Sequence, residues 1–275
     1  MDSLVSTEWL AEHLGEPDLV VVDSSWHMPA SGRNGRSEYL EAHVPGARFL
    51  DIDEVSDRAS PAPHMLPSAD EFGAAMERLG IGRLDRIVVY DNSPTRTAAR
   101  GWFMFRHFGA DQVAILDGGL PKWVAERRPT ESGGCEPREA RFDALERPDE
   151  VVAKPEVLAG GIVLDARGAG RFEGSELDPR PGVVPGHIPG ARNLPFGALY
   201  REDGTFRSRE EIRALFEQAG IDPARPFTAS CGSGVTANSL IFAAHLLGNG
   251  SVKLYDGSWS EWGADPATPK ALGPA

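Results

Sequence analysis

The sequence passes through the same succession of landmarks twice, and this internal repeat limits the possible folds more than any other feature. Each copy has an apolar run ending in aspartate, a His-Val/Ile-Pro-Gly-Ala-Arg segment, a second apolar run, and an Asp-Gly pair followed by tryptophan. In the first half these landmarks are residues 19–23, 43–48, 87–91 and 115–119, with Trp123. In the second half they are residues 162–165, 187–192, 227–231 and 253–257, with Trp262. Two copies of one domain are the simplest interpretation.

Each copy alternates short β-branched runs with longer helical patterns. This alternation is typical of α/β units around a mostly parallel sheet flanked by helices. Ser68 and Glu71 have the spacing of a capping box at the start of one amphipathic stretch, and Ser208 and Glu211 repeat it in the second copy. The fold class predicted is therefore α/β, with two tandem domains.

The chain has 275 residues, which suits two domains at roughly 100 to 200 residues each. Residues 129–148 are rich in proline, glycine and charge and have no sustained period, as expected for a linker. We therefore expect a first domain over residues 1–128 and a second over residues 149–275.

The charge balance narrows the class of partner. The formal net charge of −13 opposes binding to nucleic acid or to an anionic membrane. Most basic residues are arginines, whose planar guanidinium groups bind carboxylates through two hydrogen bonds. A small anionic substrate is therefore compatible with the composition. Two cysteines are too few for a disulfide framework, and the start of the chain lacks the pattern of a signal peptide. These features predict a cytoplasmic protein.

Cys231 follows an apolar strand pattern and precedes a helical one, with Gly232, Ser233 and Gly234 between them. A strand, a glycine-containing turn and a helix direct backbone N–H groups into a small bowl at the helix N-terminus, which favours a thiolate. The alternative is a buried cysteine that acts only as a small hydrophobe. The setting favours a nucleophile.

The equivalent position in the first copy is Asp91. A carboxylate cannot act as a sulfur nucleophile. The first copy is therefore expected to be catalytically inactive, and the chemistry to belong to the second.

The tandem layout, the two His-Val/Ile-Pro-Gly-Ala segments and the loop Cys-Gly-Ser-Gly-Val-Thr-Ala at residues 231–237 resemble the two-domain rhodanese sulfurtransferases. Within that family the loop is most similar to that of members that take sulfur from 3-mercaptopyruvate, whereas thiosulfate-preferring members carry basic residues after the cysteine. Thiosulfate is a compact dianion that benefits from nearby positive charge, and Gly232 and Ser233 supply none. The resemblance implies that Gly232, Gly234, Val235 and Thr236 help to bind the substrate.

The resemblance also implies a relay of Ser233, His64 and Asp53, in which the last two residues come from the first copy and the site lies between the domains. Such a relay would protonate and stabilise the departing enolate. Asp57 is the nearest competitor for the place of Asp53, and Asp51 is a weaker one. Taken alone, His64 lies in a proline-rich polar loop, where many histidines are solvated and idle.

Arg171 and Arg180 correspond, by the same resemblance, to residues that hold the substrate carboxylate and keto oxygen. Bidentate contacts of this kind would orient the sulfur toward Cys231. The alternative is that each arginine pairs with a neighbouring acid, namely Glu173, Glu176 or Asp178.

Several other conspicuous residues favour a structural interpretation. His43 and His187 precede matching Pro-Gly-Ala turns in both copies, as expected of a shared structural feature. Asp117 and Asp256 precede glycine after a strand, as turn residues do. Cys135 is expected to be an exposed linker thiol with no catalytic part.

The predicted activity is the transfer of sulfur from 3-mercaptopyruvate through a Cys231 persulfide to a thiol acceptor, such as a reduced thioredoxin, or to cyanide. This chemistry requires no metal and no organic cofactor. Two alternatives stay open: a thiosulfate sulfurtransferase of the same fold, and a non-enzymatic persulfide carrier. A dual-specificity phosphatase is disfavoured because the arginine that it needs six residues after the cysteine is replaced by Ala237.

Overall fold

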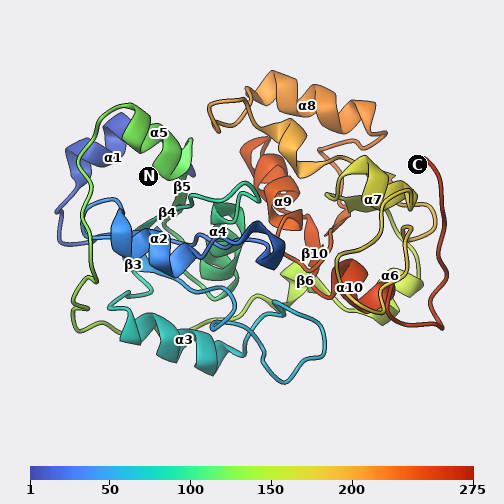
Figure 1. Ribbon diagram of the computed structural model, residues 1–275, viewed down its shortest axis with the longest axis horizontal. Coiled ribbons are helices and arrows are strands. Elements are labelled where there is room, and N and C mark those ends of the chain that lie inside the picture. The colour runs from blue at the N-terminus through green and yellow to red at the C-terminus, as the bar shows by residue number, and fades with distance from the viewer. The chain divides into compact units, whose positions relative to one another are not determined.

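The computed structural model describes residues 1–275 and divides the chain into two compact units (Figure 1). The first unit comprises residues 1–56, 66–147 and 201–206, and the second comprises residues 57–65, 148–200 and 207–275. Each unit therefore includes a short segment from the half of the sequence that otherwise builds the other. None of the helices is both long enough and apolar enough to cross a lipid bilayer.

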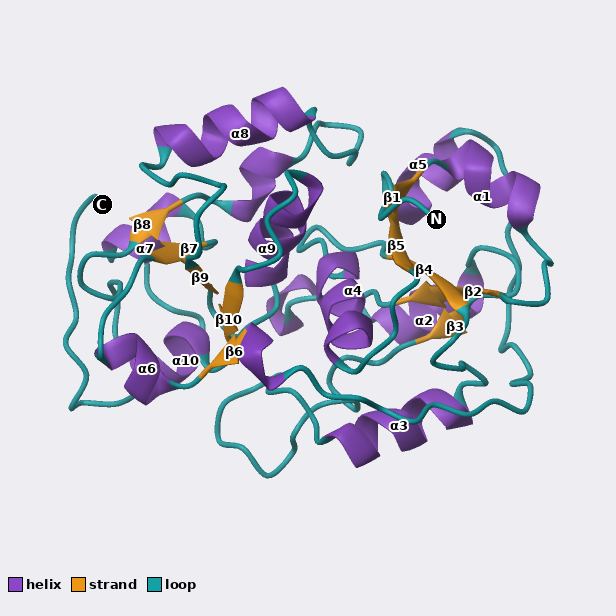
Figure 2. Cartoon of the chain, turned by 180° about the vertical axis from the view of Figure 1, so that it is seen from behind, coloured by secondary structure: helices purple, strands orange, loops and turns teal.

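The first unit is built on a five-stranded parallel sheet in the order β1-β5-β4-β2-β3. Helices cover both of its faces (Figure 2). Its strands are β1 (Leu4–Val5), β2 (Leu19–Asp23), β3 (Arg48–Phe49), β4 (Arg86–Tyr90) and β5 (Val113–Leu116). Its helices are α1 (Thr7–His13), η1 (Pro29–Ser31), α2 (Gly35–Glu41), α3 (Ala69–Arg78), α4 (Ala98–His107) and α5 (Gly119–Ala125).

The second unit repeats this plan strand for strand, in the order β6-β10-β9-β7-β8. Its strands are β6 (Val151–Val152), β7 (Val163–Asp165), β8 (Arg192–Asn193), β9 (Thr228–Ser230) and β10 (Lys253–Tyr255). Its helices are η2 (Pro148–Glu150), α6 (Lys154–Leu158), α7 (Ala169–Glu173), η3 (Phe196–Leu199), α8 (Arg209–Gln218), α9 (Ala237–Leu246) and α10 (Ser258–Trp262). The predicted α/β class and tandem repeat are confirmed.

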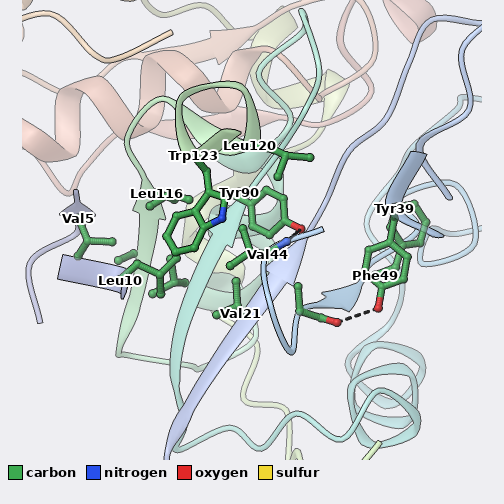
Figure 3. Packing of buried hydrophobic residues seen from close by; sticks show 13 residues of the cluster. Val5, Leu10, Val21, Tyr39, Val44, Phe49, Tyr90, Leu116, Leu120 and Trp123 are labelled. Atoms are coloured by element: carbon green, nitrogen blue, oxygen red, sulfur yellow. Dashed lines mark hydrogen bonds between the residues drawn. The ribbon is translucent and has the colours of Figure 1, made fainter. Parts of the chain in front are cut away.

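The core on one face of the first sheet is centred on Trp123 and Tyr90, which are both fully buried (Figure 3). Burying an aromatic or large aliphatic side chain contributes roughly 1.5 to 3 kcal/mol, so this cluster is a main source of stability. The indole N–H of Trp123 donates to the Pro129 carbonyl at 2.7 Å. In the second unit Trp262 donates to the Pro269 carbonyl at the same distance. The repeated tryptophan is thus a core residue in both copies.

Both predicted capping boxes are present. Ser68 accepts the amide of Glu71 at the start of α3, and the Glu71 carboxylate accepts the Ser68 amide in return. Ser208 and Glu211 make the same reciprocal pair of bonds at the start of α8. These bonds satisfy amides that a helix N-terminus leaves without intrahelical partners.

The two repeated histidines are buried parts of the frame. The ring of His43 stacks on Tyr39 with centroids 4.2 Å apart, and that of His187 stacks on Phe172 at 3.9 Å. Nδ1 of each histidine also forms a hydrogen bond with the backbone carbonyl of the same aromatic residue, at 2.7 Å for Tyr39 and 2.9 Å for Phe172. These contacts agree with a structural part for both residues.

Residues 129–147 contain no helix or strand, and they pack on the first unit. Phe142 is buried and makes an edge contact with Phe72 of α3 at 5.3 Å between centroids. Cys135 is half-buried, so the prediction of an exposed thiol is wrong. The physical reason is that the Arg48 guanidinium lies against its sulfur, which also contacts the Gly46 carbonyl at 3.7 Å.

Candidate active site

Cys231 lies between the end of β9 and the start of α9, and its side chain is buried. The amides of Gly232, Ser233 and Val235 donate to no acceptor within the protein. Unpaired amides in a loop that leads into a helix create a positive potential, which stabilises a thiolate or a developing oxyanion. The predicted strand, loop and helix are therefore present around the cysteine.

Ser258 supports this loop from beneath. Its hydroxyl accepts hydrogen bonds from the amides of Cys231 and Gly234, both at 3.1 Å, and donates to the Tyr255 carbonyl at 2.8 Å. Its backbone φ of 48° lies in the left-handed region, which glycine adopts more readily. The equivalent residue of the first copy is Gly119, with φ 58°. Sequence reasoning missed Ser258, although a serine in place of the repeated glycine was a visible signal.

Gly234 is required by its surroundings. Its φ is 72°, and a Cβ added there would lie 2.6 Å from both the carbonyl oxygen and a carboxylate oxygen of Asp256. Val235 is buried and Thr236 is half-buried. This part of the loop is therefore tightly fixed, and any part these residues have in binding substrate stays a prediction.

Ser233 and His64 meet within the second unit. The hydroxyl oxygen of Ser233 lies 2.9 Å from Nδ1 of His64, and both side chains are buried. His64 belongs to the segment 57–65, whose ends are joined by a bond from the Asp57 amide to the Met65 carbonyl at 2.8 Å. Although His64 comes from the first half of the sequence, it packs as part of the second unit.

The three candidate aspartates have separate surroundings. Asp53 belongs to the first unit, and its carboxylate accepts the indole N–H of Trp26 at 2.9 Å. Asp57 accepts the Ala59 amide at 2.9 Å within its own turn. Asp51 accepts the amides of Asp53 and Glu54, and burial raises the pKa of the Asp51 carboxyl. A part for Asp53 in the relay stays a prediction.

Arg171 and Arg180 converge on the cysteine loop. A Cβ added to Gly232 would lie 3.1 Å from a terminal nitrogen of each guanidinium. Both arginines also pair with the buried carboxylate of Asp178, at 2.5 Å and 3.2 Å. Pairing with a neighbouring acid and facing the loop are therefore compatible. Burial would raise the pKa of Asp178, but the hydrogen bond and charge of Arg171, together with Arg180, hold it below its ordinary value.

A fully buried ion pair, between Asp165 and Arg167, lies at the end of β7. Arg167 donates to the Asp165 carboxylate at 2.7 Å and to the Gly186 carbonyl at 2.9 Å, and its guanidinium lies 4.6 Å from the centre of a Trp259 ring. Trp259 in turn donates its backbone amide to the Cys231 carbonyl at 3.0 Å. Sequence reasoning missed this pair, which braces the cysteine loop through Trp259.

In the first copy, the side chain of Asp91 fills the equivalent loop. The Asp91 carboxylate is buried and accepts the amides of Ser93 at 2.9 Å and Ala98 at 2.7 Å. Burial raises the pKa of Asp91, and these amide bonds oppose the shift. Asp117, the turn residue beside this loop, accepts the amide of Phe206 at 2.8 Å.

No cluster of three or more His, Cys, Asp or Glu side chains is arranged to hold a metal ion.

The two five-stranded parallel sheets make this a tandem α/β protein. Only the second copy carries a buried cysteine in an amide-lined loop. The chain belongs to the rhodanese-like domain family, whose model matches residues 6–126 and 148–265. The human protein named 3-mercaptopyruvate sulfurtransferase is 43% identical over 271 residues, covering 94% of this chain and 91% of the relative. A chicken protein named thiosulfate sulfurtransferase is 41% identical over 273 residues, covering 94% and 93%.

A solved structure gives the same result. The crystal structure of SseA from Escherichia coli, described as a 3-mercaptopyruvate sulfotransferase with the rhodanese fold, matches with a TM-score of 0.86 and 40% identity. The match covers 95% of this chain and 100% of that one. Sequence and structure therefore assign the same family.

Proposed function

We propose that this chain is a 3-mercaptopyruvate sulfurtransferase, which moves sulfur through a persulfide on Cys231 to a thiol acceptor or to cyanide and releases pyruvate. The observation that carries the proposal is the convergence of Arg171 and Arg180 on Gly232, beside a buried cysteine whose loop has no basic side chain. Such a loop leaves recognition of a carboxylate to the two guanidinium groups. The names of the human and E. coli relatives support the same donor.

In the first step the Cys231 thiolate attacks the sulfur of 3-mercaptopyruvate. A sulfur–sulfur bond forms and the carbon–sulfur bond breaks, so that its electron pair stays on carbon as the enolate of pyruvate. The loop amides stabilise the sulfur charge, and Arg171 and Arg180 hold the carboxylate and the keto oxygen. Protonation of the enolate carbon completes pyruvate.

Ser233 and His64 would manage the proton. Their separation of 2.9 Å allows the serine hydroxyl to polarise the keto group or to pass a proton to the enolate while His64 exchanges one with it. Asp53 would orient His64 in this scheme. The first copy, with its loop filled by Asp91, would make no persulfide.

In the second step a thiol acceptor attacks the outer sulfur of the persulfide and regenerates the Cys231 thiolate. Relatives that carry thiosulfate in their names leave thiosulfate as the alternative donor. A comparison of kcat/KM for the two donors decides between them, and a clear preference for thiosulfate would overturn the proposed substrate. The other alternative, a non-enzymatic persulfide carrier, would take up sulfur on Cys231 without repeated release of pyruvate.

The test of the proposal is pyruvate release from 3-mercaptopyruvate in the presence of a small thiol. Cys231→Ser is expected to lower the rate by roughly a thousandfold or more, because it removes the nucleophile. Cys135→Ser is the matched control and is expected to keep the wild-type rate, since the partners of its sulfur, Arg48 and the Gly46 carbonyl, are not among the proposed site residues. A Cys231→Ser variant that released pyruvate at the wild-type rate would exclude the mechanism.

A further inference from the structure

A single buried carboxylate joins the two arginines that face the cysteine loop. One oxygen of Asp178 accepts from Arg171 at 2.5 Å, and the other accepts the backbone amide of Arg180 at 3.0 Å and its side chain at 3.2 Å. The side chain of Asp178 is only 2% exposed, whereas those of Arg171 and Arg180 are 24% and 20% exposed. The acid therefore lies behind the guanidinium groups, which remain the part that solvent and solutes reach.

The same two guanidinium groups keep unused hydrogen-bonding capacity. The Nε of Arg171 is buried and has no acceptor within the protein. Both nitrogens at the end of Arg180 lie within 3.3 Å of a Cβ position on Gly232. Asp178 thus fixes the position of each guanidinium without using all of its hydrogen-bonding capacity.

The charges of this triad add up to a small net value. Two guanidinium groups and one carboxylate leave a charge of +1 beside the Cys231 loop, and the low pKa of Asp178 keeps its carboxylate ionised at neutral pH. The carboxylate of a keto acid donor carries one negative charge, and thiosulfate carries two. A net charge of +1 compensates the first and undercompensates the second.

We propose that Asp178 is a positioning residue that determines donor specificity, because it places both arginines over Gly232 and limits their net charge to that of a monoanionic donor. This inference rests on the proposed function, in which Arg171 and Arg180 bind the donor anion. Removal of the negative charge adds one unit of positive charge at the site, and a dianion gains twice as much attraction from it as a monoanion does. The ratio of the two donors therefore reports the charge, and a loss of position alone lowers turnover with both donors.

The test measures kcat/KM for thiosulfate and for 3-mercaptopyruvate with cyanide as acceptor. Asp178→Asn is expected to raise the ratio of thiosulfate to 3-mercaptopyruvate on the order of tenfold at low salt, and added salt should shrink the effect. Asp178→Glu keeps the charge and is expected to keep the ratio near its wild-type value. Asp265→Asn, which removes one of the two acidic partners of Lys154 in the second unit, is the control and should leave the ratio unchanged.

An unchanged ratio in a folded Asp178→Asn variant would overturn the inference. If that variant does not fold, Leu177→Lys supplies the second test, because residue 177 is 81% exposed next to Asp178 and a lysine there adds charge without burying it. It is expected to raise the same ratio by a smaller factor, and no change would again overturn the inference. Failure of the proposed function has a different signature, namely a wild-type protein that releases no pyruvate from 3-mercaptopyruvate.

Discussion

The hydroxyl oxygen of Ser233 lies 2.9 Å from Nδ1 of His64, although 169 residues separate them in the chain. Both side chains are buried, and the backbone of His64 has a φ of 61°, which is uncommon for a residue other than glycine. A backbone held in this region persists only where its surroundings fix it. The contact is therefore specific to the folded second unit.

Removal of the Ser233 hydroxyl is expected to slow the release of pyruvate. Ser233→Ala should lower kcat with 3-mercaptopyruvate roughly a hundredfold, because a positioned proton donor contributes at least that much. Turnover with thiosulfate, whose leaving group is sulfite and needs no carbon protonation, should fall much less. Steady-state rates with the two donors test this. Equal losses with both donors would show that Ser233 acts only on the shape of the loop.

A methyl group on Gly232 is expected to displace the two guanidinium groups. A Cβ there would lie 3.1 Å from a nitrogen of both Arg171 and Arg180, closer than ordinary contact. Gly232→Ala should raise KM for 3-mercaptopyruvate roughly tenfold, since a lost charged hydrogen bond costs about that much in binding. Gly250→Ala, where a Cβ meets nothing within 4 Å, is the control. A wild-type KM in Gly232→Ala would show that Arg171 and Arg180 do not bind the substrate.

The hydroxyl of Ser258 is expected to contribute to stability through the two amides that it accepts. Ser258→Ala should lower the free energy of unfolding by roughly 1 to 3 kcal/mol, because it leaves buried amides of Cys231 and Gly234 without this acceptor. Ser258→Gly should lose less, by about 1 kcal/mol, because glycine relieves the φ of 48°. Urea unfolding measures both. The opposite order of the two variants would contradict this account.

The stability of the first unit is expected to depend on the ionisation of Asp23. Burial raises the pKa of this carboxyl from 3.8 to about 6, and the bond from the Ser25 amide at 2.8 Å only partly opposes the shift. The native state therefore keeps a proton that the unfolded chain releases, so its free energy of unfolding falls as the pH rises between these values. The difference in the pKa of Asp23 between the unfolded and native states corresponds to a loss of roughly 3 kcal/mol in the free energy of unfolding.

Asp23→Asn should flatten this part of the pH dependence, because asparagine is neutral throughout. Denaturant unfolding at several pH values between 4 and 7 measures it, roughly spanning the titration. Asp2→Asn, at an exposed position of the same unit, is the control. A slope that survives in Asp23→Asn would place the titrating group elsewhere.

The repeat and the local sequence signals anticipate much of this molecule. The alternation of strand and helix patterns predicts the two parallel sheets, and the Ser68 and Ser208 capping boxes mark two helix starts correctly. The strand, glycine turn and helix around Cys231 predict the amide-lined loop. These features depend on neighbouring residues, which is why a sequence reveals them.

Other features depend on distant contacts that no local pattern encodes. The support of the cysteine loop by Ser258 does not follow from residue spacing, because the bonded residues lie 27 and 24 positions apart. The inclusion of His64 in the second unit requires the segment 57–65 to leave the copy in which it is encoded. Cys135 was misjudged for the same reason, since the Arg48 side chain that covers it is far away in sequence.

Cys231 is proposed to carry the transferred sulfur. A single addition of 3-mercaptopyruvate without an acceptor, followed by intact-mass measurement of the protein and an assay of the pyruvate released, examines this step by itself. We expect one added sulfur atom per chain, located on Cys231 by peptide mapping, and an equal amount of pyruvate. Pyruvate release without an added sulfur on Cys231, or with the sulfur on Cys135, would show that Cys231 is not the sulfur carrier.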